Sequence, residues 1–131
     1  MTTPAPILID GHWPTPRSKV LRPILNPATL EQVGLAADCT DDEVALAVEA
    51  AARAQPAWWR VPGADKAKLL REAAQRIRAQ EHELSRLMAR ETGKPLIESV
   101  DEIDWVAAAF EYYAEVGRQS FGNSIPPVAP H

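Results

Sequence analysis

The spacing of apolar residues changes near residue 40, and this change divides the chain into two parts. Before it, short apolar runs alternate with prolines and turn residues, which is typical of short strands. After it, apolar residues recur at intervals of three and four, which is typical of helices that bury one face. The pattern therefore predicts a mainly α chain with short β-strands, including a hairpin, at its N-terminal end.

The strand region, residues 1–40, contains several stretches with the composition of strands. Residues 7–9 precede an Asp-Gly pair, which is a strong signal for a tight hairpin turn. Residues 21–26 contain Pro23, which cannot donate a ladder hydrogen bond, so this stretch is at best an edge strand. After an Asn-Pro-Ala-Thr turn, residues 32–37 are expected to form another short strand.

Three helices are predicted after residue 40. The first, over residues 41–56, begins with a Thr40–Glu43 capping box and is ended or kinked by Pro56. Its expected apolar face comprises Val44, Ala47, Val48, Ala51 and Ala52.

The second predicted helix spans residues 64–92 and stops at Gly93, because glycine suits the left-handed position at a helix end. Its expected apolar stripe comprises Leu69, Leu70, Ala73, Ile77, Leu84, Leu87 and Met88. The third predicted helix spans residues 96–120, is ended by Gly122, and precedes an extended proline-rich tail at 125–130. Its aromatic residues, expected in the core, are Trp105, Phe110, Tyr112 and Tyr113.

Composition narrows the classes of function. The 131 residues suffice for one domain, and a net charge of -4 argues against a nucleic-acid partner, which needs a basic face. No apolar run reaches the roughly 18 residues of a membrane span, so no membrane partner is expected. The N-terminal residues lack the pattern of a secretory signal, and Cys39 is the sole cysteine. A cytoplasmic location is the simplest expectation.

Candidate chemistry is sparse when the residues are considered alone. Cys39 has no histidine nearby in sequence and is expected to be an ordinary free cysteine. His12, His82 and His131 are scattered, without the spacing of a metal site. The Gly-Lys pair after residue 92 follows a helix, whereas a phosphate loop precedes one. An acidic group at 101–104 is most simply a solvated helix start. No catalytic and no cofactor-binding residue is predicted.

The order of short segments, however, resembles the aldehyde dehydrogenase superfamily. The matching segments are Ile7-Leu8-Ile9-Asp10-Gly11-His12-Trp13, Asn26-Pro27-Ala28-Thr29 with Glu31-Gln32-Val33, residues 42–59, residues 66–77, Glu91-Thr92-Gly93-Lys94-Pro95-Leu96, and Glu102-Ile103-Asp104 with Phe110-Glu111-Tyr112-Tyr113-Ala114. They cover almost the whole chain in order and at matching spacing. Three positions depart from the pattern: Leu30 replaces a glycine, Pro56 lies within a helical segment, and Lys66 replaces an arginine.

The resemblance implies that residues 1–131 are the N-terminal segment of an α/β cofactor-binding domain. The complete parent would oxidise an aldehyde to a carboxylic acid with NAD or NADP. In this family the dinucleotide glycines, the general base and the nucleophilic cysteine lie beyond the position that matches His131. No cofactor is therefore expected for this chain alone, which would be inactive.

The resemblance also implies two sets of site residues. Ile24, Leu25 and Glu91 occupy positions that offer oxygens to a monovalent cation, K+ or Na+, in several members. The alternative is ordinary backbone pairing. Glu102 and Trp105 occupy positions that line the substrate tunnel, with core packing as the alternative for Trp105. The Phe110–Ala114 run leans toward the betaine and amino-aldehyde branch, and Trp105 could face a quaternary ammonium group.

A second hypothesis comes from a different class: a truncated reading frame that serves as a non-catalytic helical binding or assembly module. The codons that follow His131 separate the two hypotheses. Both predict a homo-oligomer, because apolar side chains on the helices would lack partners.

Overall fold

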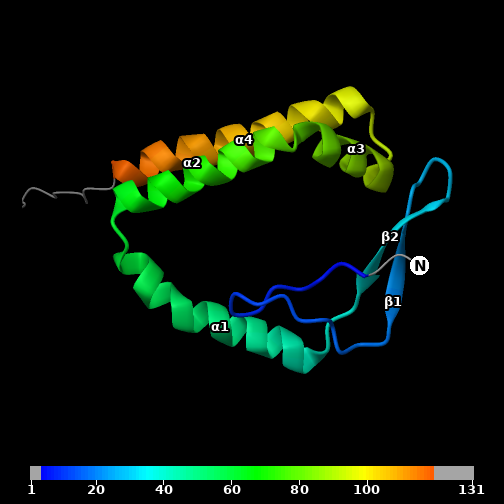
Figure 1. Ribbon diagram of the computed structural model, residues 1–131, viewed down its shortest axis with the longest axis horizontal. Coiled ribbons are helices and arrows are strands. Elements are labelled where there is room, and N and C mark those ends of the chain that lie inside the picture. Colours follow the sequence, from blue (N-terminus) through cyan, green and yellow to red (C-terminus); the bar gives the residue numbers. More distant parts are fainter. Residues whose placement is uncertain (1–3, 120–131) are drawn as a thin grey trace, which may run out of the picture.

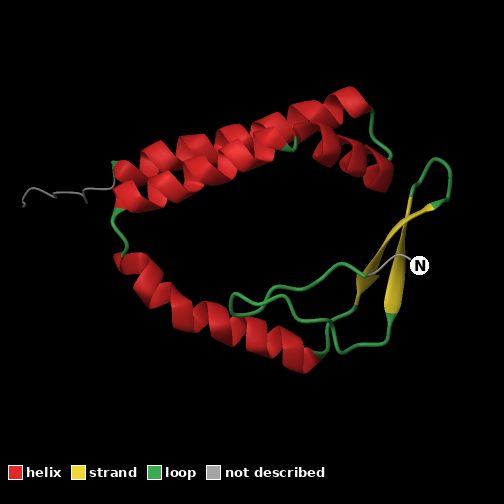
Figure 2. Cartoon of the chain, in the orientation of Figure 1, coloured by secondary structure: helices red, strands yellow, loops and turns green. Residues whose placement is uncertain are grey.

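The computed structural model describes residues 4–119, which form a two-stranded sheet and four helices (Figures 1 and 2). The elements in chain order are β1 (Leu21–Leu25), β2 (Gln32–Ala37), α1 (Asp41–Arg60), α2 (Gly63–Ala79), α3 (Glu81–Thr92) and α4 (Leu96–Arg118). The mainly α class with a short N-terminal hairpin is confirmed, but the predicted number of helices was wrong. No helix in the described part is long and apolar enough to cross a membrane.

The β-hairpin formed by β1 and β2 confirms the predicted strands at 21–26 and 32–37. The strands are antiparallel, Pro23 pairs with Leu35, and the register shifts between Ile24 and Leu25. In a sheet of only two strands both are edges, which is where a proline without an N–H is tolerated. The connecting turn contains Leu30 with a left-handed φ of 61°.

The strand predicted at residues 7–9 is absent. The structure has only an isolated bridge between Ile9 and His12, across a turn in which Asp10 and Gly11 have φ values of 52° and 76°. The tight turn is therefore confirmed. The segment does not extend into a ladder because residues 8–11 lie along α1, where they line a shallow cavity with Ala47 and other alanines.

Helix α1 begins with the predicted capping box. The Thr40 hydroxyl accepts from the Glu43 N–H, and the Glu43 carboxylate accepts from the Thr40 N–H at 2.9 Å. The prediction that the helix stops at residue 56 was wrong, since it continues through Pro56 to Arg60. Residues 51–60 are all exposed, so water can satisfy the carbonyl that the proline leaves without a donor.

The single helix predicted over 64–92 is two helices, α2 and α3, divided at Gln80. Gln80 has φ −110° and ψ 11°, outside the helical range, although no glycine or proline marks the position. The break lets two differently directed helices pack on the same long helix, because both α2 and α3 contact α4. The packing of α2 and α3 on α4 therefore outweighs the local sequence preference for one continuous helix.

Helices α2 and α4 lie side by side and antiparallel (Figure 1). Their seam is made of small buried residues, with Ala67 and Ala74 on α2 and Ala107 and Ala114 on α4. At one end the approach is closest, because a Cβ on Gly63 would lie 2.4 Å from the Gly117 carbonyl oxygen. Small side chains therefore set the separation of the two helices.

Large apolar side chains are mostly not in this core. Trp105, Tyr112 and Tyr113, which were expected to be buried, are 76%, 65% and 63% exposed. Leu69 and Leu87 of the predicted stripe are also exposed, as are Val44 and Val48 on the predicted face of α1. Contacts among the described residues cover only part of these surfaces. The predictions for Gly122 and for the tail at 125–130 lie outside the described residues.

Candidate functional site

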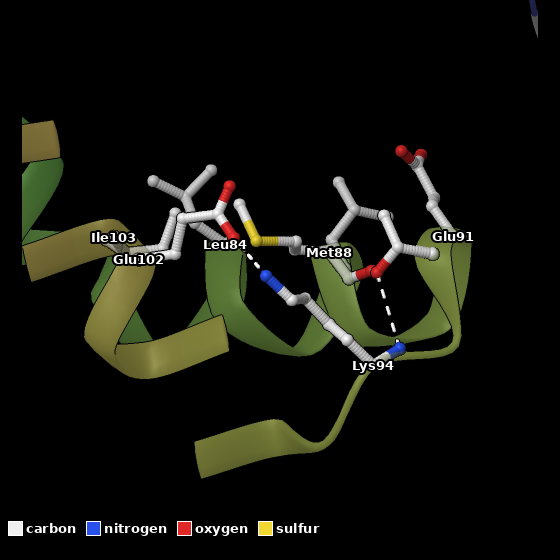
Figure 3. A pocket seen from close by; sticks show the side chains of 8 residues that line it. Leu84, Met88, Glu91, Lys94, Glu102 and Ile103 are labelled. Atoms are coloured by element: carbon white, nitrogen blue, oxygen red, sulfur yellow. Dashed lines mark hydrogen bonds and ion pairs between the residues drawn. The ribbon is translucent and has the colours of Figure 1, made fainter. Parts of the chain in front are cut away.

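The largest described cavity that includes predicted site residues lies between α3 and α4 (Figure 3). Its volume is about 430 Å³, and it is lined by Leu84, Leu87, Met88, Glu91, Thr92, Lys94, Glu102 and Ile103. Its apolar residues come from both helices, and three of its polar residues, Glu91, Thr92 and Lys94, lie at the end of α3 and in the turn to α4. Four of the eight lining residues are polar or charged, and such groups beside apolar side chains can orient a small molecule.

The turn between α3 and α4 positions the polar groups of this cavity. Gly93 caps α3 with a left-handed φ of 75°, as the sequence predicts, and its N–H donates to the Ala89 carbonyl. Thr92 adds a hydroxyl hydrogen bond to the Met88 carbonyl at 2.7 Å. The left-handed cap reverses the chain, so the residue after it, Lys94, points back across the cavity toward α4 (Figure 3).

Lys94 forms an ion pair with Glu102 across the cavity. The hydrogen bond to Glu102 raises the pKa of the Lys94 ammonium, and burial opposes this rise. At neutral pH the lysine is therefore charged and neutralises the Glu102 carboxylate. Sequence reasoning missed this pair because it assigned residues 91–94 only to a helix end. The available signal was a lysine directly after a left-handed glycine, with acidic residues one to two turns into the next helix.

The predicted cation residues come from two elements that the structure brings into contact, β1 and α3. A Cβ on Gly93 would lie 2.5 Å from Cγ of Pro27, so the end of α3 lies directly against the turn that follows β1. Ile24 and Leu25 pair with Gly34 and Gln32 of β2, which is the backbone pairing offered as the alternative. The cation site itself stays a prediction. Its contributing oxygens would be mainly carbonyls, for which clusters of acidic side chains are not required.

The predicted tunnel residues, Glu102 and Trp105, lie one turn apart on α4. Glu102 lines the cavity, whereas Trp105 is not among the described residues that line it and is 76% exposed. The structure therefore does not bring the two side chains into one pocket. The core-packing alternative for Trp105 does not hold within residues 4–119.

The other residues considered as candidates lie outside the α3–α4 cavity. Cys39 is exposed beside the start of α1. The described residues hold no group of three or more His, Cys, Asp or Glu side chains able to bind a metal ion. Glu43 is a buried carboxylate whose pKa is lowered by the backbone N–H groups of Thr40 and Arg17. Its hydrogen bonds tie α1 to the N-terminal segment, which is a structural role.

Comparison with known proteins gives consistent results. Residues 13–131 match the aldehyde dehydrogenase family. Aminoaldehyde dehydrogenase 1 of Malus domestica, described as peroxisomal, is 44% identical over 94% of this chain, which covers 25% of that relative. The succinate-semialdehyde dehydrogenase [NADP(+)] of Escherichia coli is 34% identical over 91% of this chain and 25% of its own length.

Solved structures agree with the sequence relatives. Lactaldehyde dehydrogenase from Escherichia coli matches 99% of this chain with a TM-score of 0.92 and 31% identity, over 27% of its own chain. A betaine aldehyde dehydrogenase from Staphylococcus aureus, in complex with NAD+, matches 98% of this chain with a TM-score of 0.89. The chain spans about a quarter of the length of these relatives. The residues described above, from the Asp-Gly turn to the paired helices, belong to a member of the aldehyde dehydrogenase family.

Proposed function

We propose that this chain forms the N-terminal part of the cofactor-binding domain of an NAD(P)-dependent aldehyde dehydrogenase, which oxidises an aldehyde to a carboxylic acid. The observation that carries the proposal is the agreement of nearly the whole backbone with a quarter of a longer enzyme, at a TM-score of 0.92 over 99% of this chain. The sequence match over residues 13–131 supports the same placement.

The chain alone has no aldehyde-oxidising activity in this proposal. The reaction needs a thiolate that attacks the aldehyde, a dinucleotide that takes the hydride, and water that hydrolyses the thioester. The sole thiol, Cys39, is exposed at the start of α1 and lies outside the α3–α4 cavity. Gly93-Lys94 follows the C-terminal end of α3, whereas phosphates favour helix N-termini. These residues do not fit a dinucleotide, so we place no step of the chemistry on them.

In this proposal the chain contributes part of the wall of the parent enzyme's substrate entrance. Glu102 and Trp105 would line the substrate entrance of the parent, with the Lys94 pair holding the Glu102 carboxylate against α3. An exposed indole favours a cationic aldehyde, because an ammonium group is attracted to the face of the ring. Several relatives are named as aminoaldehyde or betaine aldehyde dehydrogenases, which supports the same substrate class.

A direct test replaces the matching first quarter of the Malus domestica enzyme with residues 1–131. We expect this chimera to reduce NAD(P) with an aldehyde, while residues 1–131 alone do not. Activity of the isolated chain that persists after Cys39→Ala would contradict the proposal, and so would an inactive chimera. In the chimera, Trp105→Ala should raise KM for an amino-aldehyde roughly fivefold and leave KM for a neutral aldehyde unchanged, given about 1 kcal/mol for one cation–π contact.

The cation site is tested in the same chimera. Replacing K+ by a bulky organic cation should lower Tm if carbonyls of Ile24 and Leu25 and the carboxylate of Glu91 bind the ion, since a ligand of the native state stabilises it. Glu91→Gln should reduce the dependence on K+, whereas Glu98→Gln on α4 should retain it. The same K+ dependence in all three proteins would leave Glu91 without a role in the site.

A further inference from the structure

Among the described residues that line the α3–α4 cavity, Lys94 is the single basic one. The lining also holds two carboxylates, Glu91 and Glu102, and Lys94 forms its ion pair with the second of them. Figure 3 shows the lysine side chain running from the turn across the cavity to the Glu102 carboxylate. Lys94 therefore controls how much of the Glu102 charge is available to a bound molecule.

The backbone on either side of Lys94 gives its side chain a fixed starting point. Gly93 before it is held in the left-handed conformation, and Pro95 after it restricts Lys94 to extended backbone. The Lys94 N–H donates to the Thr92 hydroxyl at 3.4 Å. The ammonium group therefore reaches Glu102 with little further loss of backbone freedom, which favours a persistent pair over the transient contacts of most surface lysines.

The ion pair also keeps Glu102 apart from Trp105. The two residues are three positions apart on α4, a spacing at which helical side chains are neighbours. Glu102 nevertheless lines the cavity beside α3, whereas Trp105 is 76% exposed and outside that lining. Glu98, one turn before Glu102, adds to the rise in the pKa of Lys94. Without the lysine, two carboxylates and an indole on successive turns of one helix would be free to face a cation.

We propose that Lys94 sets the charge preference of the substrate entrance by neutralising Glu102 and holding it against α3. The inference rests on the proposed function, in which Glu102 and Trp105 line that entrance, and it names the residue that positions Glu102. With the pair intact, a cationic aldehyde is recognised by the indole alone. With the pair broken, the carboxylate attracts a cationic aldehyde and repels an anionic one.

The size of the effect follows from the exposure of the pair. The Lys94 and Glu102 side chains are 31% and 48% exposed, so water and salt weaken the interaction of Glu102 with a charged substrate. Charge interactions at such sites change affinity roughly threefold. Opposite changes for a cationic and an anionic aldehyde would therefore shift the ratio of their KM values about tenfold.

The experiment uses the Malus domestica chimera described above and three aldehydes. Betaine aldehyde is cationic, tert-butylacetaldehyde has the same shape without the charge, and succinate semialdehyde is anionic. We expect Lys94→Met to lower KM roughly threefold for the cationic aldehyde and to raise it roughly threefold for the anionic one. KM for the neutral aldehyde and kcat for all three should stay unchanged. High salt should reduce both changes, because it screens exposed charges.

Three further variants assign the effect to the ion pair. Lys94→Arg keeps the charge and should keep the three KM values. Lys68→Met on α2 removes an exposed lysine outside the cavity, so it makes the same change in net charge without the expected effect. Lys94→Met in a chain that already carries Glu102→Gln should change KM much less than in the wild type, because the lysine acts through that carboxylate.

The outcomes separate this inference from the proposed function. An active chimera in which Lys94→Met changes the three KM values alike, or in which Lys68→Met has the same effect, overturns the role of Lys94 and leaves the proposed function in place. Equal effects of Lys94→Met with and without Glu102→Gln overturn the route through that carboxylate. Loss of all activity in Lys94→Met would assign the lysine to folding or catalysis and overturn the inference as well. An inactive chimera with unaltered residues 1–131 overturns both.

Discussion

Helices α2 and α4 are held together by small residues, whereas α1 is held to the N-terminal segment by polar groups. In the first region alanines are fully buried at a close helix crossing, and ion pairs lie beside the seam. In the second, Glu43 is the most buried residue of α1, and its Oε1 accepts from the Arg17 N–H at 2.8 Å. The α2–α4 seam therefore depends mainly on the fit of small side chains, whereas the attachment of α1 depends on hydrogen bonds to a carboxylate.

The difference teaches how each region would respond to a mutation or to a change in pH. The α2–α4 seam depends on shape, so any added volume there separates the helices. The attachment of α1 depends on a charged carboxylate, so it responds to pH. Large apolar side chains are exposed in both regions, including Val48 on α1 and Tyr112 on α4. Each region therefore has its own internal contacts and also exposes large apolar side chains among residues 4–119.

The largest effect is expected at the close crossing of α2 and α4. In Gly63→Ala the new Cβ would lie 2.4 Å from the Gly117 carbonyl oxygen, and neither backbone can move without opening the seam. We expect a loss of about 3 kcal/mol in the free energy of unfolding, the upper part of the range for overpacking. Urea denaturation measures it.

The control is Gly117→Ala, on the other side of the same crossing. Its Cβ would have nothing within 4 Å, and alanine favours the helix, so the variant should gain about 0.5–1 kcal/mol. Similar losses in the two variants would show that the seam is not set by the Gly63 contact.

The next effect is expected at the cap of α3, which joins the helical layer to the hairpin. Gly93→Val combines a positive φ with a Cβ that would lie 2.5 Å from Cγ of Pro27. We expect a loss of about 2 kcal/mol, from left-handed strain and local overpacking. Gly93→Asn should lose less, because asparagine tolerates this φ but still has a Cβ. An unchanged Tm for the valine variant contradicts the cap assignment.

Much of the fold follows from local patterns. The capping box at Thr40, the left-handed stop at Gly93 and the turn at Asp10-Gly11 are each set by a few adjacent residues, and each is confirmed. The division at Gln80 was missed because it depends on how α2 and α3 pack on α4. Burial was mispredicted for Trp105 because periodicity locates an apolar face without naming the segment that covers it.

The candidate site was predictable only in part for the same reason. The resemblance supplied Glu102 and Glu91, and the structure places both at one cavity. Lys94, which pairs with Glu102, was not predicted because the pair depends on the reversal of the chain at Gly93. A family resemblance assigns a role to each position separately. An ion pair between residues on either side of a turn can be recognised only from the three-dimensional structure.

A smaller and pH-dependent effect is expected in the α1 region. Glu43→Gln removes the charge that accepts hydrogen bonds from the Arg17 and Thr40 N–H groups, so Tm at pH 7 should fall. The pKa of Glu43 is lowered from 4.5 in the folded chain, so its contribution is present above that value. It is lost as the pH falls through the lowered pKa.

The wild type and Glu43→Gln should therefore differ at pH 7 and converge in acid. Glu49→Gln is the matched control, because Glu49 is on the same helix and exposed. Thermal unfolding between pH 7 and pH 3 measures the three curves. A constant gap between the wild type and Glu43→Gln across this range would show that the loss comes from geometry and not from charge.

The smallest effect is expected in the hairpin turn, where Leu30 occupies a position at which the family pattern has glycine. Leu30 has a φ of 61° and is 73% exposed, so its side chain adds strain and little packing. The turn keeps this conformation because the Leu30 N–H donates to the Asn26 carbonyl at 2.8 Å and the Asn26 N–H donates to the Glu31 carbonyl at 2.9 Å. Removing the Cβ relieves about 1–2 kcal/mol of left-handed strain, while glycine gives back about 0.5–1 kcal/mol in unfolded-state entropy. Leu30→Gly should therefore gain about 0.5–1 kcal/mol in the free energy of unfolding. Leu30→Ala keeps the Cβ and should stay close to the wild type, so an equal gain in both variants would trace the effect to the exposed apolar side chain and not to the backbone.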